Sequence, residues 1–179
     1  MNSGPREFDI IVIGATGFTG ALVAEYLCEN YGVDGELRWA AAGRSTDKLA
    51  ALKDSLGTAA QQLPLIVADT LDDQSMQELV QRTRVVVTTV GPYARYGSVL
   101  VAACATHGTH YCDLAGEVQW IRRMIDSHDT DARRSGARRR HARRPRRPDR
   151  GRRRPSIRAT PDGSPRPVRR GRPRPCELR

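Results

Sequence analysis

A glycine-rich segment near the start of the chain has the composition of a phosphate-binding loop. Its sequence is Gly14-Ala15-Thr16-Gly17-Phe18-Thr19-Gly20, between an apolar run at 8–13 and a helical pattern at 21–30. In such a turn the first glycine permits a tight bend, the second lets the backbone approach a pyrophosphate, and the third lets the helix pack on the strand. The spacing is GxxGxxG rather than GxGxxG, but its place between strand and helix predicts a dinucleotide site. A turn that serves packing alone is the alternative.

The end of the second apolar run indicates which dinucleotide binds. A predicted strand at 37–42 is followed by Gly43, Arg44 and Ser45, with Lys48 one helical turn later. NAD-binding proteins usually carry an acidic residue here that holds the ribose 2′-hydroxyl, whereas an arginine accommodates a 2′-phosphate. We therefore predict that the cofactor is NADP. The alternative is that Arg44 is solvated and Ser45 only caps the next helix.

Two further candidates follow the third and fourth predicted strands. Asp69 comes after the strand at 65–68, where its carboxylate could bond the adenine amino group or cap the following helix. Gly91-Pro92-Tyr93 closes the strand at 85–90, where a doubly wound sheet passes the nicotinamide end of a cofactor. A small residue and a fixed φ let the backbone run beside a ligand there, although they also suit an ordinary turn.

The sequence identifies no catalytic residue. One common reductase arrangement pairs a tyrosine with a lysine four residues later, and the only lysines, Lys48 and Lys53, do not follow any tyrosine at that spacing. His107 and His110 flank a glycine, a pattern that favours helix capping or exposure over metal binding. Five residues near predicted strand ends could exchange a proton but are more often structural: Tyr93, Tyr96, Tyr111, Asp113 and Glu117.

The elements that position these residues alternate between strand and helix. Apolar runs that predict strands lie at 8–13, 37–42, 65–68, 85–90 and 110–114. This alternation predicts an α/β fold, a Rossmann-like doubly wound parallel sheet of about five strands in the order 3-2-1-4-5. In the first helix, Leu22, Val23, Tyr26 and Leu27 share one face and are expected to pack on the sheet.

The composition excludes several classes of protein. The chain has 179 residues and four cysteines without a CxxC pair, which argues against a disulfide scaffold and a structural zinc site. No apolar run approaches the roughly 18 residues of a membrane span. The charged residues before the first strand are not typical of a signal peptide. We therefore expect a cytoplasmic protein.

The net charge of +10 divides unevenly along the chain. Residues 1–131 carry 10 Lys+Arg and 17 Asp+Glu, a net charge of −7, whereas residues 132–179 carry 20 Arg and three acids, a net charge of +17. The second segment is rich in proline, lacks aromatic residues and contains few apolar ones, so it cannot bury enough surface to fold alone. We predict a folded NADP-binding domain over 1–131 and a disordered basic tail over 132–179.

Four segments of the chain resemble one family of oxidoreductases. They are DIIVIGATGFTG (9–20), AAAGRS (40–45), VVVTTVGPYARYG (85–97) and HYCDLAGE (110–117). Together they resemble the NADP-binding domain of the saccharopine dehydrogenase-like oxidoreductases, in the branch of the trans-acting enoyl reductases. The resemblance implies that the three loop glycines hold the pyrophosphate, Arg44 the 2′-phosphate, and the segment 91–93 the nicotinamide side.

The same resemblance implies an activity and a place in the cell. Its members would reduce a carbon–carbon double bond with NADPH, in a long lipid intermediate on a carrier protein during polyketide-lipid biosynthesis. Such a protein is expected in the cytoplasm or at the inner face of the plasma membrane. Family members continue after Ser135-Gly136-Ala137-Arg138 into another strand and a substrate domain, and this chain departs from them there.

The departure after residue 138 suggests a truncated enzyme. We expect the substrate domain to be absent, and the Arg, Pro, Gly, Ala and Ser composition favours the hypothesis that the tail is an out-of-frame translation. Two alternatives remain. One is an NADP-binding regulatory module whose arginine-rich tail contacts nucleic acid without sequence specificity, and the other is a non-functional remnant.

Overall fold

The computed structural model describes residues 5–141 of the chain. The basic tail predicted over 132–179 therefore lies outside the described residues from position 142 onward. In chain order the elements are β1 (Phe8–Ile13), α1 (Phe18–Tyr31), β2 (Trp39–Gly43), α2 (Thr46–Ser55), the 3-10 turn η1 (Thr58–Ala60), β3 (Leu65–Val67), α3 (Asp73–Arg82), β4 (Thr83–Thr88), α4 (Tyr93–Tyr96), α5 (Ser98–His107), β5 (His110–Asp113), α6 (Val118–Ser135) and β6 (Arg139–Arg140).

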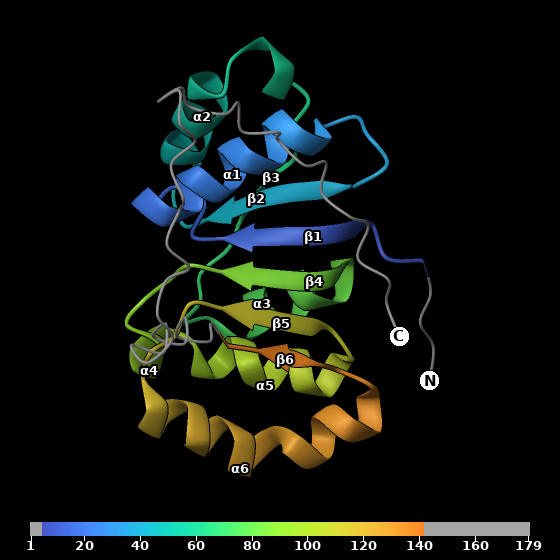
Figure 1. The fold of residues 1–179 in the computed structure, drawn as a ribbon, viewed down its shortest axis with the longest axis vertical. Coiled ribbons are helices and arrows are strands. Elements are labelled where there is room, and N and C mark those ends of the chain that lie inside the picture. The colour runs from blue at the N-terminus through green and yellow to red at the C-terminus, as the bar shows by residue number, and fades with distance from the viewer. Residues whose placement is uncertain (1–4, 142–179) are drawn as a thin grey trace, which may run out of the picture. The chain divides into compact units, whose positions relative to one another are not determined.

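The strands form one parallel sheet in the order β3-β2-β1-β4-β5-β6 (Figure 1). This arrangement confirms the predicted doubly wound fold and its strand order. In register, Ile13 of β1 lies opposite Ala42 of β2 and Thr88 of β4. The carboxyl ends of the three central strands therefore finish side by side. Ligands of open α/β sheets bind at this edge.

The sixth strand corrects the sequence-based prediction of five. Arg139 and Arg140 pair in parallel with Tyr111 and Cys112, and the Tyr111 N–H donates to the Arg138 carbonyl over 2.8 Å. The residues at 132–135, which charge alone assigned to the tail, continue α6. The physical reason is that a parallel ladder is made by main-chain groups, so a two-residue edge strand needs no apolar pattern.

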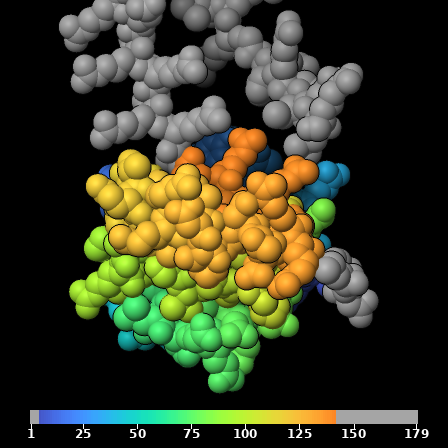
Figure 2. All heavy atoms as spheres, turned by 90° about the horizontal axis from the view of Figure 1, so that it is seen from below, coloured from blue at the N-terminus to red at the C-terminus, as the bar shows by residue number. Residues whose placement is uncertain are grey.

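Two layers of helices cover the sheet. On one face α3, α5 and α6 enclose a core in which Met76, Leu100 and Trp120 are almost fully buried. On the other face α1 and α2 pack over β1 and β2 around Trp39 and Leu49. Figure 2 looks onto the side of α6 and shows this helix as a continuous band beside α5 and α3. Strands covered on both faces account for their uninterrupted apolar sequences.

Helix α1 packs on the sheet through a different face from the predicted one. Leu22 is 50% exposed and Tyr26 is 57% exposed, so the prediction that they face the core is wrong. The buried residues of α1 are Gly20, Ala24 and Leu27. Two of these three are small and let the helix axis approach β1 closely, which turns the bulky residues outward.

Candidate cofactor-binding site

A cavity of about 230 Å³ opens at the carboxyl ends of the central strands. Four chain segments meet around it, because β1, β2, β3 and β4 all finish at this edge. The volume is below the roughly 300–1,000 Å³ of a closed small-molecule pocket, so a whole dinucleotide would also extend along the surface of the edge. The lining residues are Ile13, Gly14, Thr16, Gly17, Gly43, Arg44, Ala68, Thr70, Thr89, Val90 and Gly91.

The glycine-rich loop forms one wall of the cavity. Gly14 has a φ of +80°, and a Cβ there would lie 2.6 Å from the Val90 Cγ2 atom. A Cβ on Gly20 would overlap the Gly14 carbonyl oxygen, which fixes the close packing of α1 on the loop. The Thr89 hydroxyl donates to the same carbonyl over 3.2 Å and ties the loop to the end of β4.

The N-terminus of α1 faces this loop without a capping side chain. Gly17 is the N-cap residue, and the first turn contains no acidic residue. By contrast, Ser45 caps α2 and Asp72 caps α3 through their side chains. The leading N–H groups of α1 are thus left for a ligand, and a helix N-terminus in this state favours an anion.

Arg44 and Ser45, which follow β2, have different surroundings. Arg44 lines the cavity and makes no hydrogen bond or ion pair with another residue of the described part of the chain. The Ser45 hydroxyl instead accepts the Lys48 N–H over 3.3 Å and begins α2, which is the capping role weighed for it as the alternative. The guanidinium is therefore available for a ligand.

The remaining predicted residues lie around the cavity at different distances. Gly91 lines it, Pro92 is the N-cap of α4, and Tyr93 is the first residue of that helix. The Asp69 carboxylate accepts the Leu71 N–H over 3.0 Å in the turn before α3, and Asp69 is not among the lining residues.

Within the glycine-rich loop, Thr16 lines the cavity, whereas Ala15 and Phe18, which the sequence also predicts to bind the cofactor, do not. Ala15 is fully buried beneath the loop, whereas the Phe18 side chain is 85% exposed. Sequence reasoning missed several lining residues: Ile13, Gly43, Ala68, Thr70, Thr89 and Val90. They are the last residues of strands or follow a strand within three residues. Their position at the carboxyl edge of the predicted sheet is the only sequence feature that could have identified them.

The candidate proton donors are engaged in structural contacts. The Tyr93 hydroxyl donates to the Thr88 carbonyl over 3.3 Å and accepts the Leu114 N–H over 3.2 Å, and burial raises its pKa. The Glu117 carboxylate accepts the N–H groups of Tyr93 and Ala94. These groups hold neighbouring loops together and do not line the cavity.

The three other candidates also lie away from the cavity. Asp113 accepts the Ala115 N–H over 3.0 Å and lies 2.9 Å from the His141 Nδ1 atom. Tyr111 is buried beside it, and burial together with the Asp113 charge raises the pKa of its phenol. The Tyr96 ring lies 5.1 Å below the Arg95 guanidinium. Among residues 5–141, the lining of the cavity includes no Asp, Glu, His, Cys or Tyr.

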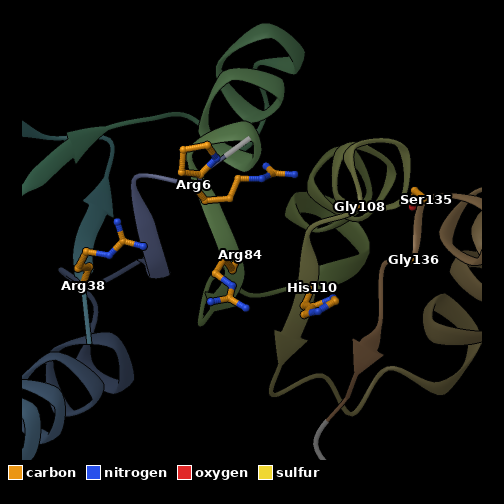
Figure 3. Close-up of a pocket in the computed structure, with 8 residues that line it drawn as sticks. Arg6, Arg38, Arg84, Gly108, His110, Ser135 and Gly136 are labelled. Atoms are coloured by element: carbon orange, nitrogen blue, oxygen red, sulfur yellow. The ribbon is translucent and has the colours of Figure 1, made fainter. Parts of the chain in front are cut away.

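A larger cavity of about 570 Å³ lies at the opposite edge, among the amino ends of the strands (Figure 3). Each of its three arginines makes contacts within the fold. Arg6 donates to the carbonyls of Val80 and His107 over 2.7 and 2.8 Å. Arg38 and Arg84 both pair with the Asp9 carboxylate, at 3.4 and 3.6 Å.

His110 lines the same cavity, and its Nδ1 atom accepts the Arg138 N–H over 3.2 Å. Burial and the charges of Arg138 and Arg84 lower its pKa. Within residues 5–141 no three His, Cys, Asp or Glu side chains gather as a metal would require. Every helix of that part of the chain is too short or too polar to span a bilayer.

Curated relatives and solved structures resemble this chain. A trans-acting enoyl reductase of Mycobacterium leprae is 48% identical over 138 residues, which are 77% of this chain and 32% of that protein. A trans-acting enoyl reductase of Mycobacterium ulcerans is 46% identical over the same shares. The chain thus spans about a third of the length of these curated relatives.

Two solved structures share the fold at low sequence identity. Saccharopine dehydrogenase from Saccharomyces cerevisiae superposes with a TM-score of 0.60 and 18% identity, over 75% of this chain and 26% of that one. Triphenylmethane reductase from Citrobacter, in complex with NADP(H), superposes with a TM-score of 0.55 and 19% identity, over 75% of this chain and 48% of that one.

A family profile decides the assignment that the fold alone leaves open. The profile of the saccharopine dehydrogenase NADP binding domain matches residues 10–145, which include the greater part of β1, the glycine-rich loop and the other five strands of the sheet. The chain therefore belongs to the saccharopine dehydrogenase NADP binding domain family, and NADP is its cofactor.

Proposed function

We propose that the cavity at the carboxyl edge holds NADP(H) and that the chain is the cofactor half of an NADPH-dependent enoyl reductase. The observation that carries the proposal is that the α1 N-terminus, which like those of α5 and α6 has no side-chain cap, meets Arg44 across one cavity, where the starts of α5 and α6 do not lie. The loop glycines would hold the pyrophosphate, and Arg44 would hold the 2′-phosphate. Both contacts are charge-assisted and suit the two anionic parts of the cofactor.

The three glycines of the loop support a ligand because they are not equally required by the fold. Gly14 and Gly20 are fixed by the contacts that a Cβ would make with the protein. Gly17 has extended backbone angles, φ −85° and ψ 166°, and a Cβ there would lie an ordinary 3.4 Å from the Gly14 carbonyl. Packing therefore does not demand glycine at 17, whereas the close approach of a pyrophosphate does.

The nicotinamide end would lie against Gly91-Pro92-Tyr93, beyond β4. Bound NADPH supplies the hydride for reduction. The role of this chain would be to bind and orient the cofactor. Gly91 offers backbone without a side chain, and the Tyr93 ring lies 3.7 Å from the position that a Cβ on Gly91 would take. Because both Tyr93 hydroxyl bonds are made to main chain, this phenol positions the loop and does not exchange a proton.

The proposed substrate class comes from the relatives. Two mycobacterial proteins at 46% and 48% identity are named trans-acting enoyl reductases. By that likeness the acceptor would be the enoyl double bond of a long lipid intermediate presented by a carrier protein. An enzyme with such a substrate would work in the cytoplasm or at the inner face of the plasma membrane, and this location is part of the proposal.

A titration with NADPH and NADH tests the cofactor assignment. We expect the full chain to prefer NADPH, and Arg44→Ala to lose about 10- to 100-fold of that affinity while NADH binding stays unchanged, since a charge-assisted bond contributes about 1.5–3 kcal/mol. Arg122→Ala, which removes an exposed arginine paired with Asp126, is the matched control. Equal affinity of the unaltered chain for the two cofactors would contradict the assignment.

The oxidation of NADPH in the presence of an enoyl thioester tests the reductase assignment. Consumption that requires the double bond, and that is absent with the saturated thioester, supports it. NADPH oxidation at the same rate with both thioesters would overturn the substrate class while leaving the cofactor assignment intact, and no oxidation with either would overturn a reductase activity of this cofactor half on its own.

A further inference from the structure

We propose that Glu117 is a positioning residue for the nicotinamide side of the cavity, an inference that rests on the proposed function. Its Oε1 atom accepts the Tyr93 N–H over 2.6 Å, and its Oε2 atom accepts the Ala94 N–H over 2.8 Å. Both oxygens of one carboxylate are thus used on two successive main-chain groups more than twenty residues earlier in the chain. Charge-assisted bonds of this kind are short and strong.

The bridge made by Glu117 is reinforced by the aromatic residue it holds. The Tyr93 hydroxyl links the end of β4 to the loop after β5 through the Thr88 carbonyl and the Leu114 N–H. The Tyr93 ring packs against Trp120 with 5.7 Å between ring centroids, and the Trp120 Nε1–H donates to the Ser98 hydroxyl over 3.0 Å. The segment that leads into α4 is therefore fixed by the β5–α6 connection together with the end of β4 and Trp120 of α6.

The fixed loop is the one that reaches the cavity. Val90 and Gly91 line it, and only Pro92 separates them from the main-chain groups that Glu117 binds. Gly91 has no side chain with which to anchor itself, so its position depends on what holds its neighbours. Glu117 itself does not line the cavity and acts through the 91–94 backbone.

Loss of the Glu117 contacts should weaken binding of the nicotinamide half of the cofactor only. The segment 91–94 leads from β4 into the first turn of α4, whereas Gly14, Gly17 and Arg44 belong to loops after β1 and β2. If Glu117 is removed, the groups proposed for the pyrophosphate and the 2′-phosphate keep their own supports. The contact proposed for the nicotinamide loses its support. Glu117→Gln is the sharp variant, because its single amide oxygen can satisfy only one of the two N–H groups.

Calorimetric titrations with NADP⁺ and with adenosine 2′,5′-bisphosphate, which lacks the nicotinamide, test the inference. We expect Glu117→Gln to weaken NADP⁺ binding about 5- to 50-fold and to leave the bisphosphate affinity within about twofold, as loss of roughly one charged hydrogen bond predicts. All titrations use the full chain at one salt concentration, so binding contributed by its other arginines is the same in every variant.

Asp72→Asn is the matched control, because Asp72 also caps a helix start with its carboxylate, on Gln74 of α3, and does not line the cavity. It should lower the melting temperature without changing either affinity. Tyr93→Phe keeps the ring and removes the hydroxyl bridge, so it should reproduce the selective loss more weakly, and it decides the matter if Glu117→Gln does not fold.

Unchanged NADP⁺ affinity in folded Glu117→Gln, or equal losses for the two ligands, would overturn the positioning role. Failure of the proposed function has a different signature. In that case the unaltered chain binds neither NADP⁺ nor the bisphosphate, and no difference between variants arises.

Discussion

At the scale of single residues, Gly17 and Gly20 lie three positions apart and serve different ends. A Cβ on Gly20 overlaps the Gly14 carbonyl oxygen, whereas a Cβ on Gly17 finds an ordinary contact distance. The space at Gly20 is needed for the packing of α1 on the loop, and we assign the space at Gly17 to the proposed pyrophosphate contact. Substitution by alanine separates the two roles.

We expect Gly20→Ala to lower the free energy of unfolding by about 1–3 kcal/mol, the usual cost of overpacking. Gly17→Ala should stay within about 1 kcal/mol of the unaltered chain, since the change costs little more than a less favourable N-cap, yet lose NADPH affinity. Urea unfolding and NADPH titration of the two variants measure both quantities. A stable Gly17→Ala that binds NADPH normally would contradict the proposed pyrophosphate contact.

Stability should fall on mild acidification partly because of His110. Burial and the charges of Arg138 and Arg84 lower its pKa in the fold, so below the ordinary histidine pKa the unfolded chain binds the extra proton first. Stability is then full above about pH 6.5 and decreases below it.

Melting temperatures between pH 7.5 and 5.5 measure this dependence. His110→Gln should flatten part of the decrease, and the lowered pKa of His128, which is caused first by burial, accounts for a further part. An unchanged slope in His110→Gln would show that the residue does not contribute.

Much of the candidate site could be predicted from residue types, because parallel strands bring their carboxyl ends to one edge. Gly14, Arg44 and Gly91 meet at the cavity for this reason. The roles of Tyr93 and Glu117 could not be predicted. Their bond joins residues 24 positions apart, and no local pattern indicates which main-chain group a carboxylate will find.

At the scale of elements, the ends of α3 and α5 depend on one side chain from outside them. The Arg6 guanidinium donates hydrogen bonds to the carbonyls of Val80 and His107, which lie in the last turns of the two helices. A cation at a helix C-terminus also interacts favourably with the negative end of the helix dipole. Arg6 thus joins the start of the chain to two helices far along it.

Arg6→Met should lower the free energy of unfolding by about 2 kcal/mol, because it keeps the aliphatic stem and removes charged hydrogen bonds. Arg122→Met, which removes an exposed i,i+4 pair with Asp126, should cost at most about 0.5 kcal/mol. Chemical denaturation compares the two. Equal effects of the two substitutions would contradict the capping role of Arg6.

The strands with clear apolar runs, and their order in the sheet, could be predicted from the sequence. Elements without an apolar pattern could not. The run at 8–13 coincides with β1 because it is buried on both faces. The predicted face of α1 is wrong, because the apolar stripe containing Leu22 and Tyr26 does not show that small residues of the helix allow its close approach to the sheet. The short strand β6 carries two arginines and has no pattern to detect.

At the scale of the whole molecule, the folded part extends beyond the point at which the charge changes sign. Ala132 is 5% exposed, the Ser135 hydroxyl donates to the Ala105 carbonyl, and the Arg139 guanidinium donates to the Met124 carbonyl over 2.6 Å. The end of α6 and β6 are therefore bound to the body of the sheet and its helices.

A chain that ends after Asp131 should consequently be less stable than one that ends after Arg144. We expect a difference of at least about 2 kcal/mol, because the shorter chain loses the burial of Ala132 and several hydrogen bonds, each contributing about 1 kcal/mol. Thermal and urea unfolding of the two truncated chains measure it. Equal stabilities would restore the boundary that charge alone suggests.

The pairing of β6 with β5 has an evolutionary consequence. The Arg140 side chain is exposed, and its residue joins the sheet opposite Cys112 through main-chain groups. Selection for the fold at position 140 then acts on the extension of the backbone and only weakly on the identity of the side chain. At position 139 it also acts on the side chain, because the Arg139 guanidinium donates to the Met124 carbonyl.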